Sequence, residues 1–295
     1  MKNTNHSLFD KYEMIKDLGT GSSGSVTLVR HISMDQERAL KKVPKSSAFA
    51  ESALSEARLL KSLEHPSIPR IFDFEEDNAF YYIVEEYIDG ETLDSFLLHQ
   101  QLISPGLFFN ICEQLCNVFI YLHTQISTPI IYRDLKPEHI IVCHNKLKLI
   151  DFGVSAYVIQ DGNNFNHYGN IEFSAPECFT EDTITPAADI YSLGQLLQYI
   201  LTFTPDSFSH KFQHIIQKAT TSDASLRYVT VAELYQEIQE IQKLTGQPHL
   251  IHKIAVLGSH RAAAPPRGRF THLRTQYPWI SWYLHRLSKK RTLPW

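Results

Sequence analysis

The chain has 295 residues, 43% of them hydrophobic, and a net charge of −4. This length suits one large domain or two packed lobes, and no run reaches the roughly 20 uncharged apolar residues that a membrane helix needs. The N-terminus lacks the apolar core of a secretory signal, and the four cysteines lack the paired spacing of zinc ligands. We therefore expect a cytoplasmic protein with free thiols and no transmembrane segment.

The charge is unevenly distributed along the chain. Residues 246–295 contain nine Lys or Arg and no Asp or Glu, so the first 245 residues hold 19 basic and 32 acidic residues, a net charge of −13. All three tryptophans also lie in this C-terminal part. Such a shift in composition predicts a domain boundary near Gly246, followed by a basic, tryptophan-containing tail.

Residues 12–87 have the pattern of a strand-rich region. Short β-favouring runs, such as SVTLVR at 25–30 and FYYIVEEYI at 80–88, surround one helical stretch at 52–63. We expect a small sheet with a single inserted helix.

After Gly90 the pattern becomes helical. Ser104 and Pro105 form an N-cap and first-turn pair for a helix with one broad apolar stripe. Asp189–Leu201 is apolar nearly all round, which predicts a buried central helix. Thr230–Glu233 is a capping box for a final helix that ends near Gly246. A strand-rich lobe followed by a helical lobe is typical of an α+β enzyme with a cleft between the lobes.

A glycine-rich segment lies among the predicted strands. Glycines 19, 21 and 24, between Leu18 and Val26, would let the backbone approach phosphate groups closely. Alone this pattern fits an ordinary hairpin turn equally well, and the absence of a following helix argues against a dinucleotide site. Ala39 and Lys41 occupy the next strand, and Glu56 follows 15 residues after the lysine. On their own these two charges would be read as a common surface ion pair.

Two later segments carry the strongest chemical signal. Ile131–His139 has the sequence IYRDLKPEH, and Leu149–Gly153 has the sequence LIDFG. They resemble the catalytic loop and the DFG motif of the eukaryotic-type, bacterial-like serine/threonine protein kinases. The same family closes its activation segment with a motif like Ala175-Pro-Glu177 and pairs that glutamate with an arginine, here Arg227. It also has a buried central helix similar to the one that begins near Asp189.

The resemblance runs in order from about Tyr12 to Leu244. It implies the two-lobed α+β protein kinase fold over residues 12–245, with a small strand-rich N-lobe at about 12–87 and a helical C-lobe at about 91–245. It also implies an ATP-dependent enzyme that transfers the γ-phosphate of ATP to serine or threonine hydroxyls of a protein substrate. The DLKPE sequence of the catalytic loop favours serine and threonine over tyrosine.

The resemblance further implies a role for each matching residue. Asp134 would accept or orient the substrate hydroxyl, and Lys136 would neutralise charge on the γ-phosphate. Lys41 would hold the α- and β-phosphates, steadied by an ion pair with Glu56. The cofactors would be ATP and Mg²⁺, or Mn²⁺ in its place, with Asp151 and His139 at the metal positions. The nucleotide would be bound by Leu18, Gly19, Gly21, Gly24, Val26, Ala39, Lys41 and the backbone of Glu86 and Ile88, with Glu85 at the gatekeeper position.

His139 is the main departure from the family pattern, which has an asparagine ligand there. Mg²⁺ prefers oxygen ligands, whereas Mn²⁺ accepts nitrogen more readily. Three interpretations stay open: one metal on Asp151 suffices, the enzyme depends on Mn²⁺, or the chain is a pseudokinase that binds nucleotide or a partner without efficient phosphotransfer.

Other departures concern packing and substrates. Tyr132 replaces a histidine, and its ring can pack against Phe152 in the same way. Asn170 replaces a threonine and weakens the inference about substrate class. Only about six residues, Phe203–Phe208, separate the central helix from the next helical stretch, where the family inserts another helix that docks substrates. Protein substrates would then be recognised on a narrow or different surface.

The activation segment contains no threonine between Asp151 and Glu177. In the family the arginine before the catalytic aspartate, here Arg133, often pairs with a phosphate on this segment. We expect that threonine phosphorylation is not needed here, and that Arg133 meets an acid such as Asp161 or is solvated.

Three interpretations of the tail at 246–295 stay open. Its aromatic and basic residues could lie on an anionic membrane or contact nucleic acid. The third is a poorly ordered end or the remnant of a second domain. IHKIAVLGSHR at 251–261 begins like a buried strand, but the GK[ST] of a phosphate-binding loop is absent.

Overall fold

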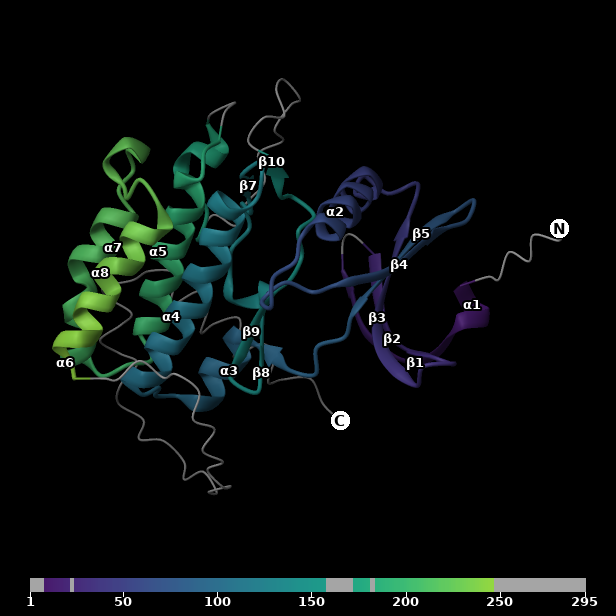
Figure 1. Ribbon diagram of the computed structural model, residues 1–295, viewed down its shortest axis with the longest axis horizontal. Coiled ribbons are helices and arrows are strands. Elements are labelled where there is room, and N and C mark those ends of the chain that lie inside the picture. The colour runs from purple at the N-terminus through teal and green to yellow at the C-terminus, as the bar shows by residue number, and fades with distance from the viewer. Residues whose placement is uncertain (1–7, 22–23, 158–171, 181–183, 247–295) are drawn as a thin grey trace, which may run out of the picture. The chain divides into compact units, whose positions relative to one another are not determined.

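The computed structural model describes residues 8–21, 24–157, 172–180 and 184–246 (Figure 1). The chain divides into two units, residues 1–249 and 250–295, and every described residue lies in the first. The predictions for residues 247–295, for Asn170 and for Asp161 therefore lie outside the described residues. Within the described ranges, every helix is too short or too polar to cross a membrane.

The N-terminal part of the described chain is an antiparallel five-stranded sheet with the strand order β1-β2-β3-β5-β4. Its elements are α1 (Leu8–Lys11), β1 (Tyr12–Gly21), β2 (Gly24–His31), β3 (Gln36–Pro44), α2 (Ala50–Ser62), β4 (Ile71–Glu76) and β5 (Phe80–Glu86). The predicted strand-rich region with one inserted helix is confirmed.

The helix α2 packs on this sheet through small residues (Figure 1). Ala53 and Ala57, one turn apart, contact Val43 of β3 and Ile83 of β5. The N-cap residue Phe49 makes no side-chain capping hydrogen bond, so packing rather than capping holds this helix in place.

The C-terminal part is mainly helical. It begins with β6 (Glu91–Thr92), α3 (Leu93–Gln100), α4 (Pro105–Ile120) and the π-helix η1 (Tyr121–Gln125). Short strands and turns follow: β7 (Ile130–Ile131), η2 (Pro137–His139), β8 (Ile140–Cys143), β9 (Lys146–Leu149), β10 (Ala156–Tyr157) and η3 (Pro176–Phe179). The last elements are α5 (Ala187–Leu201), α6 (Asp206–Ser209), η4 (His210–Phe212), α7 (Gln213–Ala219), η5 (Ala224–Leu226) and α8 (Val231–Leu244).

The predicted helix starts agree with the structure. The hydroxyl of Ser104 accepts a hydrogen bond from the backbone N–H of Leu107, which caps α4. At α8 the hydroxyl of Thr230 accepts from the N–H of Glu233. The Glu233 carboxylate accepts from the N–H of Val229 rather than from that of Thr230, so the capping box is closed one residue earlier than its usual form.

The connection after α5 is shorter than we predicted. Helix α6 begins at Asp206, so only residues 202–205 separate it from α5, and the prediction of a gap reaching Phe208 is wrong. The reason is aromatic packing: the rings of Phe208 and Phe212 lie 5.4 and 4.9 Å from that of Phe108 on α4. Because these rings are buried against α4, the chain forms helical turns directly after Pro205.

Candidate functional site

The loop after β7 presents Asp134 and Lys136, and a buried aspartate holds its backbone. Asp189, at the start of α5 and 0% exposed, accepts hydrogen bonds from the N–H groups of Tyr132 and Arg133, each at 2.8 Å. Its carboxylate also lies 2.9 Å from the ring Nε2 of His123. Arg133 has a φ of +74°, a strained conformation for a residue with a side chain, and the two charge-assisted bonds stabilise it. The result is a fixed direction for the side chain of Asp134.

Asp134 faces a cation from its own loop. The Nζ of Lys136 donates to its Oδ2 at 2.8 Å, and both side chains are about one-fifth exposed. A carboxylate beside an ammonium group that solvent can reach is suited to orient a hydroxyl and to attract an anionic group at the same point.

A second set of charges comes from the sheet and from α2. The Nζ of Lys41 on β3 lies 2.5 Å from Oε2 of Glu56 and 4.0 Å from Oδ1 of Asp151. Burial by itself would lower the pKa of Lys41, but the two carboxylates outweigh it and the pKa is raised, so the ammonium stays charged. The other carboxylate oxygen of Glu56 accepts from the N–H of Phe152 at 2.9 Å. Glu56 thus joins Lys41 to the segment that carries Asp151.

Asp151 itself sits on a left-handed backbone. Its φ is +63°, and the Ser52 hydroxyl of α2 donates to the carbonyl of Gly153 just beyond it. Burial by itself would raise the pKa of Asp151, but the cation of Lys41 and the hydrogen bond from the N–H of Gly153 favour the charged form, and the pKa is lowered. The carboxylate is therefore ionised at neutral pH and available to a cation.

His139, at the end of η2, lies between the two aspartates. Its Nδ1 is 3.0 Å from the backbone oxygen of Asp134, and its Nε2 is 3.5 Å from Oδ2 of Asp151. Because a carbonyl oxygen can only accept, we assign the ring proton to Nδ1, which leaves the Nε2 lone pair facing the Asp151 carboxylate. Burial lowers the pKa of His139 despite the nearby carboxylates, which favours this neutral ring. Nε2 of His139 and the Asp151 carboxylate are then two acceptors facing each other, and a cation between them would stabilise this arrangement.

The aromatic neighbours of this histidine are also fixed. The ring of Tyr132 lies 5.1 Å from that of Phe152, so the predicted packing of these two rings is confirmed. The Tyr132 hydroxyl donates to the backbone oxygen of Ile150 at 2.5 Å and lies 3.4 Å from Nδ1 of His139. Tyr132 therefore orients the strand end that leads to Asp151.

The glycine-rich hairpin is formed by β1 and β2. Gly19 pairs with Val26, and Gly21 pairs with Gly24. At Gly24, φ is +148° and an added Cβ would lie 2.1 Å from the backbone oxygen of Lys42, so only glycine fits. At Gly19 a Cβ would meet no atom within 4 Å, so its smallness serves no internal packing and leaves room for a ligand. Leu18 on the same hairpin is 40% exposed.

The remaining predicted nucleotide residues lie on β3 and β5 and just after β5. Ala39 pairs with Glu85 in the β3–β5 ladder, and Lys41 pairs with Ile83 two residues along. Burial raises the pKa of Glu85 to about 7, and the negative charges of Glu56 and Asp151 add to this effect. A carboxyl group whose pKa is raised toward neutral pH thus lies close to the Lys41 network.

Ile88 lies in the chain between β5 and β6. The Glu86 side chain takes no part in the Lys41 network, since its carboxylate instead accepts from Nζ of Lys148 at 2.7 Å. The structure therefore brings together Lys41, Glu56, Asp134, Lys136, His139 and Asp151, and leaves the Glu86 side chain apart from them.

Comparisons with known proteins agree with this geometry. A family model described as "Protein kinase domain" matches residues 12–265. The chain belongs to the protein kinase family. Among its curated relatives, calcium-dependent protein kinase 4 of Plasmodium falciparum is 32% identical over 278 residues, which cover 89% of this chain and 50% of that protein.

Two bacterial kinases are also similar to the chain. Serine/threonine-protein kinase PrkC of Bacillus subtilis is 28% identical, over 78% of this chain and 40% of that protein. Serine/threonine-protein kinase PknB of Mycobacterium tuberculosis is 27% identical, over 82% of this chain and 44% of that protein. The chain thus spans half or less of the length of these relatives. The predicted family and the predicted two-lobed kinase fold are confirmed.

The predicted ion pair between Arg227 and Glu177 is present in the structure. Nη1 and Nη2 of Arg227 lie 2.5 and 2.8 Å from the two carboxylate oxygens of Glu177, and both residues are buried.

Arg133 departs from our expectation: it is 8% exposed and donates to the backbone oxygen of Val154 at 3.3 Å, so the interpretation as a solvated side chain is wrong. The reason is that the turn after the DFG motif covers it.

Two contributions to the site were not predicted from the sequence. The role of Asp189 in holding the catalytic loop was not foreseen, although an aspartate in an otherwise apolar helix is a sign of a buried polar contact. The hydroxyl of Ser52 on the carbonyl of Gly153 has no such sequence signal, because the two residues lie 101 positions apart.

Proposed function

We propose that this kinase transfers the γ-phosphate of ATP to serine or threonine hydroxyls of a protein substrate. The observation that carries the proposal is the assembled ion network: Lys41 is paired with Glu56, and Glu56 is bonded to the DFG backbone. A kinase needs this pair in place to position the triphosphate. The names of PrkC and PknB as serine/threonine kinases, and the Asp134–Lys136 contact, support the choice of hydroxyl.

In this proposal different residues bind the nucleotide and accept the substrate proton. The glycine hairpin would cover the phosphates, and the backbone of Glu86 and Ile88 would hold the adenine. Lys41 would bind the α- and β-phosphate oxygens. As the substrate oxygen bonds to the γ-phosphorus and the bond to the β-phosphate oxygen breaks, Asp134 would take the hydroxyl proton.

In the same step Lys136, 2.8 Å from Asp134, would neutralise charge on the transferred group. ADP and the phosphorylated protein would be the products.

The metal site would be formed by Asp151 and His139. A bound divalent ion supplies charge neutralisation between the phosphates. Asp151 Oδ2 and His139 Nε2 lie 3.5 Å apart, close enough for both atoms to be ligands of one ion. Among the described residues no three acidic, histidine or cysteine side chains are arranged to hold a metal ion by themselves, so nucleotide or water oxygens would complete the site. Because Nε2 is a nitrogen donor, we propose that Mn²⁺ supports activity better than Mg²⁺.

The second candidate function is a pseudokinase, and it rests on the same histidine. If His139 prevents productive binding of the metal, the chain would bind nucleotide without turnover. The two candidates are separated by measuring transfer from γ-labelled ATP to a generic basic protein with Mg²⁺ and, separately, with Mn²⁺, with Lys41→Met as the blank. Phosphoserine or phosphothreonine above the blank supports the kinase, whereas nucleotide binding without any transfer in either metal supports the pseudokinase.

We also propose that the kinase domain ends near residue 245 and that the protein acts in the cytoplasm. The basic tail at 246–295 would contact anionic membrane or nucleic acid by charge. Salt-sensitive binding to anionic vesicles or to DNA, lost when the residues after Gly246 are deleted, is the test.

A further inference from the structure

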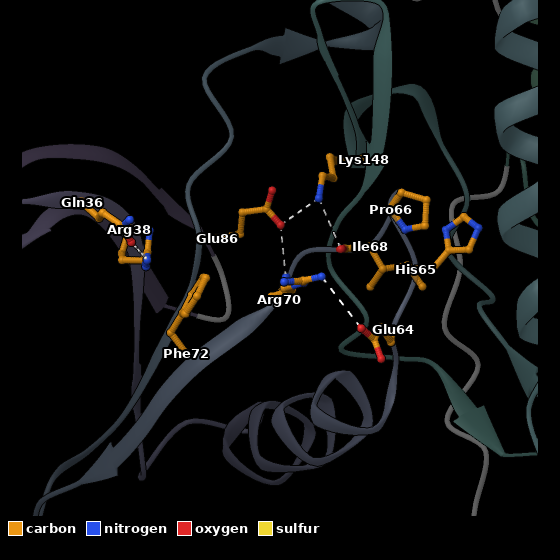
Figure 2. A pocket seen from close by; sticks show the side chains of 10 residues that line it. All are labelled: Gln36, Arg38, Glu64, His65, Pro66, Ile68, Arg70, Phe72, Glu86 and Lys148. Carbon is orange, nitrogen blue, oxygen red and sulfur yellow. Dashed lines mark hydrogen bonds and ion pairs between the residues drawn. The ribbon is translucent and has the colours of Figure 1, made fainter. Parts of the chain in front are cut away.

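A groove of about 710 Å³ lies on the described structure beside the segment that joins the two lobes. Figure 2 shows side chains from four places in the chain around it: Arg38 of β3, Arg70 before β4, Glu86 of β5 and Lys148 of β9. Among the residues predicted to bind nucleotide or metal, only Glu86 lines it, through the side chain rather than the backbone. The groove is therefore separate from the phosphate-transfer site.

Positive charge exceeds negative charge in this groove. Three cations, Arg38, Arg70 and Lys148, share it with the two acids Glu64 and Glu86. Lys148 and Glu86 neutralise each other at 2.7 Å. A local surplus of positive charge stands out in a domain whose first 245 residues carry a net charge of −13.

Both arginines remain available to a ligand. The Arg70 and Glu64 side chains lie 3.9 Å apart and are 71% and 89% exposed. An ion pair this exposed to solvent contributes almost nothing to stability. Arg38 forms no ion pair with any acid in the described part of the chain; it donates only to the backbone of Glu37 and to the Gln36 amide. A guanidinium group has five N–H donors, so Arg38 has further N–H groups left to donate to a carboxylate.

An apolar surface lies directly beside this charge. The guanidinium carbon of Arg38 stacks 3.8 Å from the ring centre of Phe72, which is 47% exposed (Figure 2). The His65 ring on the other side of the groove carries little charge, because burial and the nearby Lys148 lower its pKa. A ligand that fits must combine acidic groups with an apolar one.

We propose that this groove binds an acidic segment of a partner protein, with carboxylate side chains on Arg38 and Arg70 and an apolar side chain on Phe72. The basic tail at 246–295 is a poor occupant because it contains no acidic residue. A simple inorganic anion would leave Phe72 unused. The volume is that of a site for a few side chains, which suits a short peptide segment. Binding here is independent of phosphotransfer, so it goes beyond the proposed function.

The test uses the full chain and a fluorescein-labelled nine-residue peptide with one Phe among Glu and Asp, measured by fluorescence anisotropy. A matched peptide has Gln and Asn in place of Glu and Asp. The acidic peptide should bind at least tenfold more tightly than the amide peptide, and the difference should shrink as salt rises, as expected for charged contacts.

The variants locate the site. R38E/R70E should weaken binding of the acidic peptide by about tenfold or more, and R38Q/R70Q should weaken it less. R58E/K61E, which changes the same charge at two exposed positions of α2, is the control and should bind like the wild type. Circular dichroism checks the folding of each variant.

Several results would overturn the proposal. These are no binding of the acidic peptide at millimolar concentration, equal loss in R38E/R70E and R58E/K61E, or equal affinity for the amide peptide. Phosphotransfer to a basic protein is measured in parallel on the wild type. If the acidic peptide does not bind to the groove, the proposed kinase activity is still judged by its own assay.

Discussion

The carboxyl group of Glu85 offers a quantitative test of the electrostatics around Lys41. Burial raises its pKa to about 7 from an ordinary value of 4.5, and Glu56 and Asp151 add to the effect. Between these two pH values the unfolded chain has lost a proton that the folded protein still holds. The free energy of unfolding must therefore fall as pH rises from about 4.5 to 7, and the loss is complete above pH 7.

Replacing Glu85 by glutamine removes this cost, since the amide does not ionise. The two pKa values correspond to roughly 3 kcal/mol in total, of which about 2.5 kcal/mol develops between pH 5 and pH 8. Glu85→Gln should thus gain stability relative to the wild type as pH rises, by about 5–10 °C in Tm at pH 8 compared with pH 5.

The assay is urea or thermal unfolding of both proteins at several pH values between 5 and 8. Glu13→Gln, at an exposed position of β1, is the control for losing one surface charge, and its effect is subtracted at each pH. A stability difference for Glu85→Gln that stays the same from pH 5 to pH 8, or that reverses in sign, would refute the reasoning about Glu85.

Further predictions concern catalysis. Lys41→Met and Asp151→Asn should each lower phosphotransfer by more than about 100-fold without unfolding the protein, because both groups position triphosphate charge. His139→Asn should raise the rate with Mg²⁺ and lower the Mn²⁺/Mg²⁺ rate ratio, since it replaces a nitrogen donor by oxygen. Asp189→Asn should cost about 1–3 kcal/mol of stability and reduce kcat, because an amide cannot accept from both loop N–H groups. Phosphatase treatment should leave activity unchanged, because the segment from Asp151 to Glu177 contains no threonine.

Each of these has a decisive negative result. Near-normal turnover in folded Lys41→Met and Asp151→Asn would mean that these residues do not hold the nucleotide. An unchanged metal ratio in His139→Asn, checked by Mn²⁺ titration with electron paramagnetic resonance, would remove the histidine from the metal site. For Asp189→Asn the decisive negative result is wild-type Tm and kcat. For the activation segment it is lost activity together with a phosphosite mapped by mass spectrometry.

Local sequence determined most of the fold and the identity of the reactive groups. Helix starts at Ser104 and Thr230 follow from short-range capping chemistry, and strands in residues 12–87 follow from β-favouring runs. The DFG and catalytic-loop motifs could be found because the chemistry fixes residue types within a few positions. These properties depend on neighbours in the chain, which a sequence displays directly.

Only the tertiary structure decided how those groups are held and how they titrate. Asp189 reaches the loop from 57 residues away, and the pKa of Glu85 depends on how deeply β5 is covered and on charges from α2 and the DFG segment. The groove likewise brings together Arg38, Arg70 and Lys148 from three separate parts of the chain. Burial and Coulomb energies depend on distances through space, and residues remote in sequence come close only when the sheet and the helices pack.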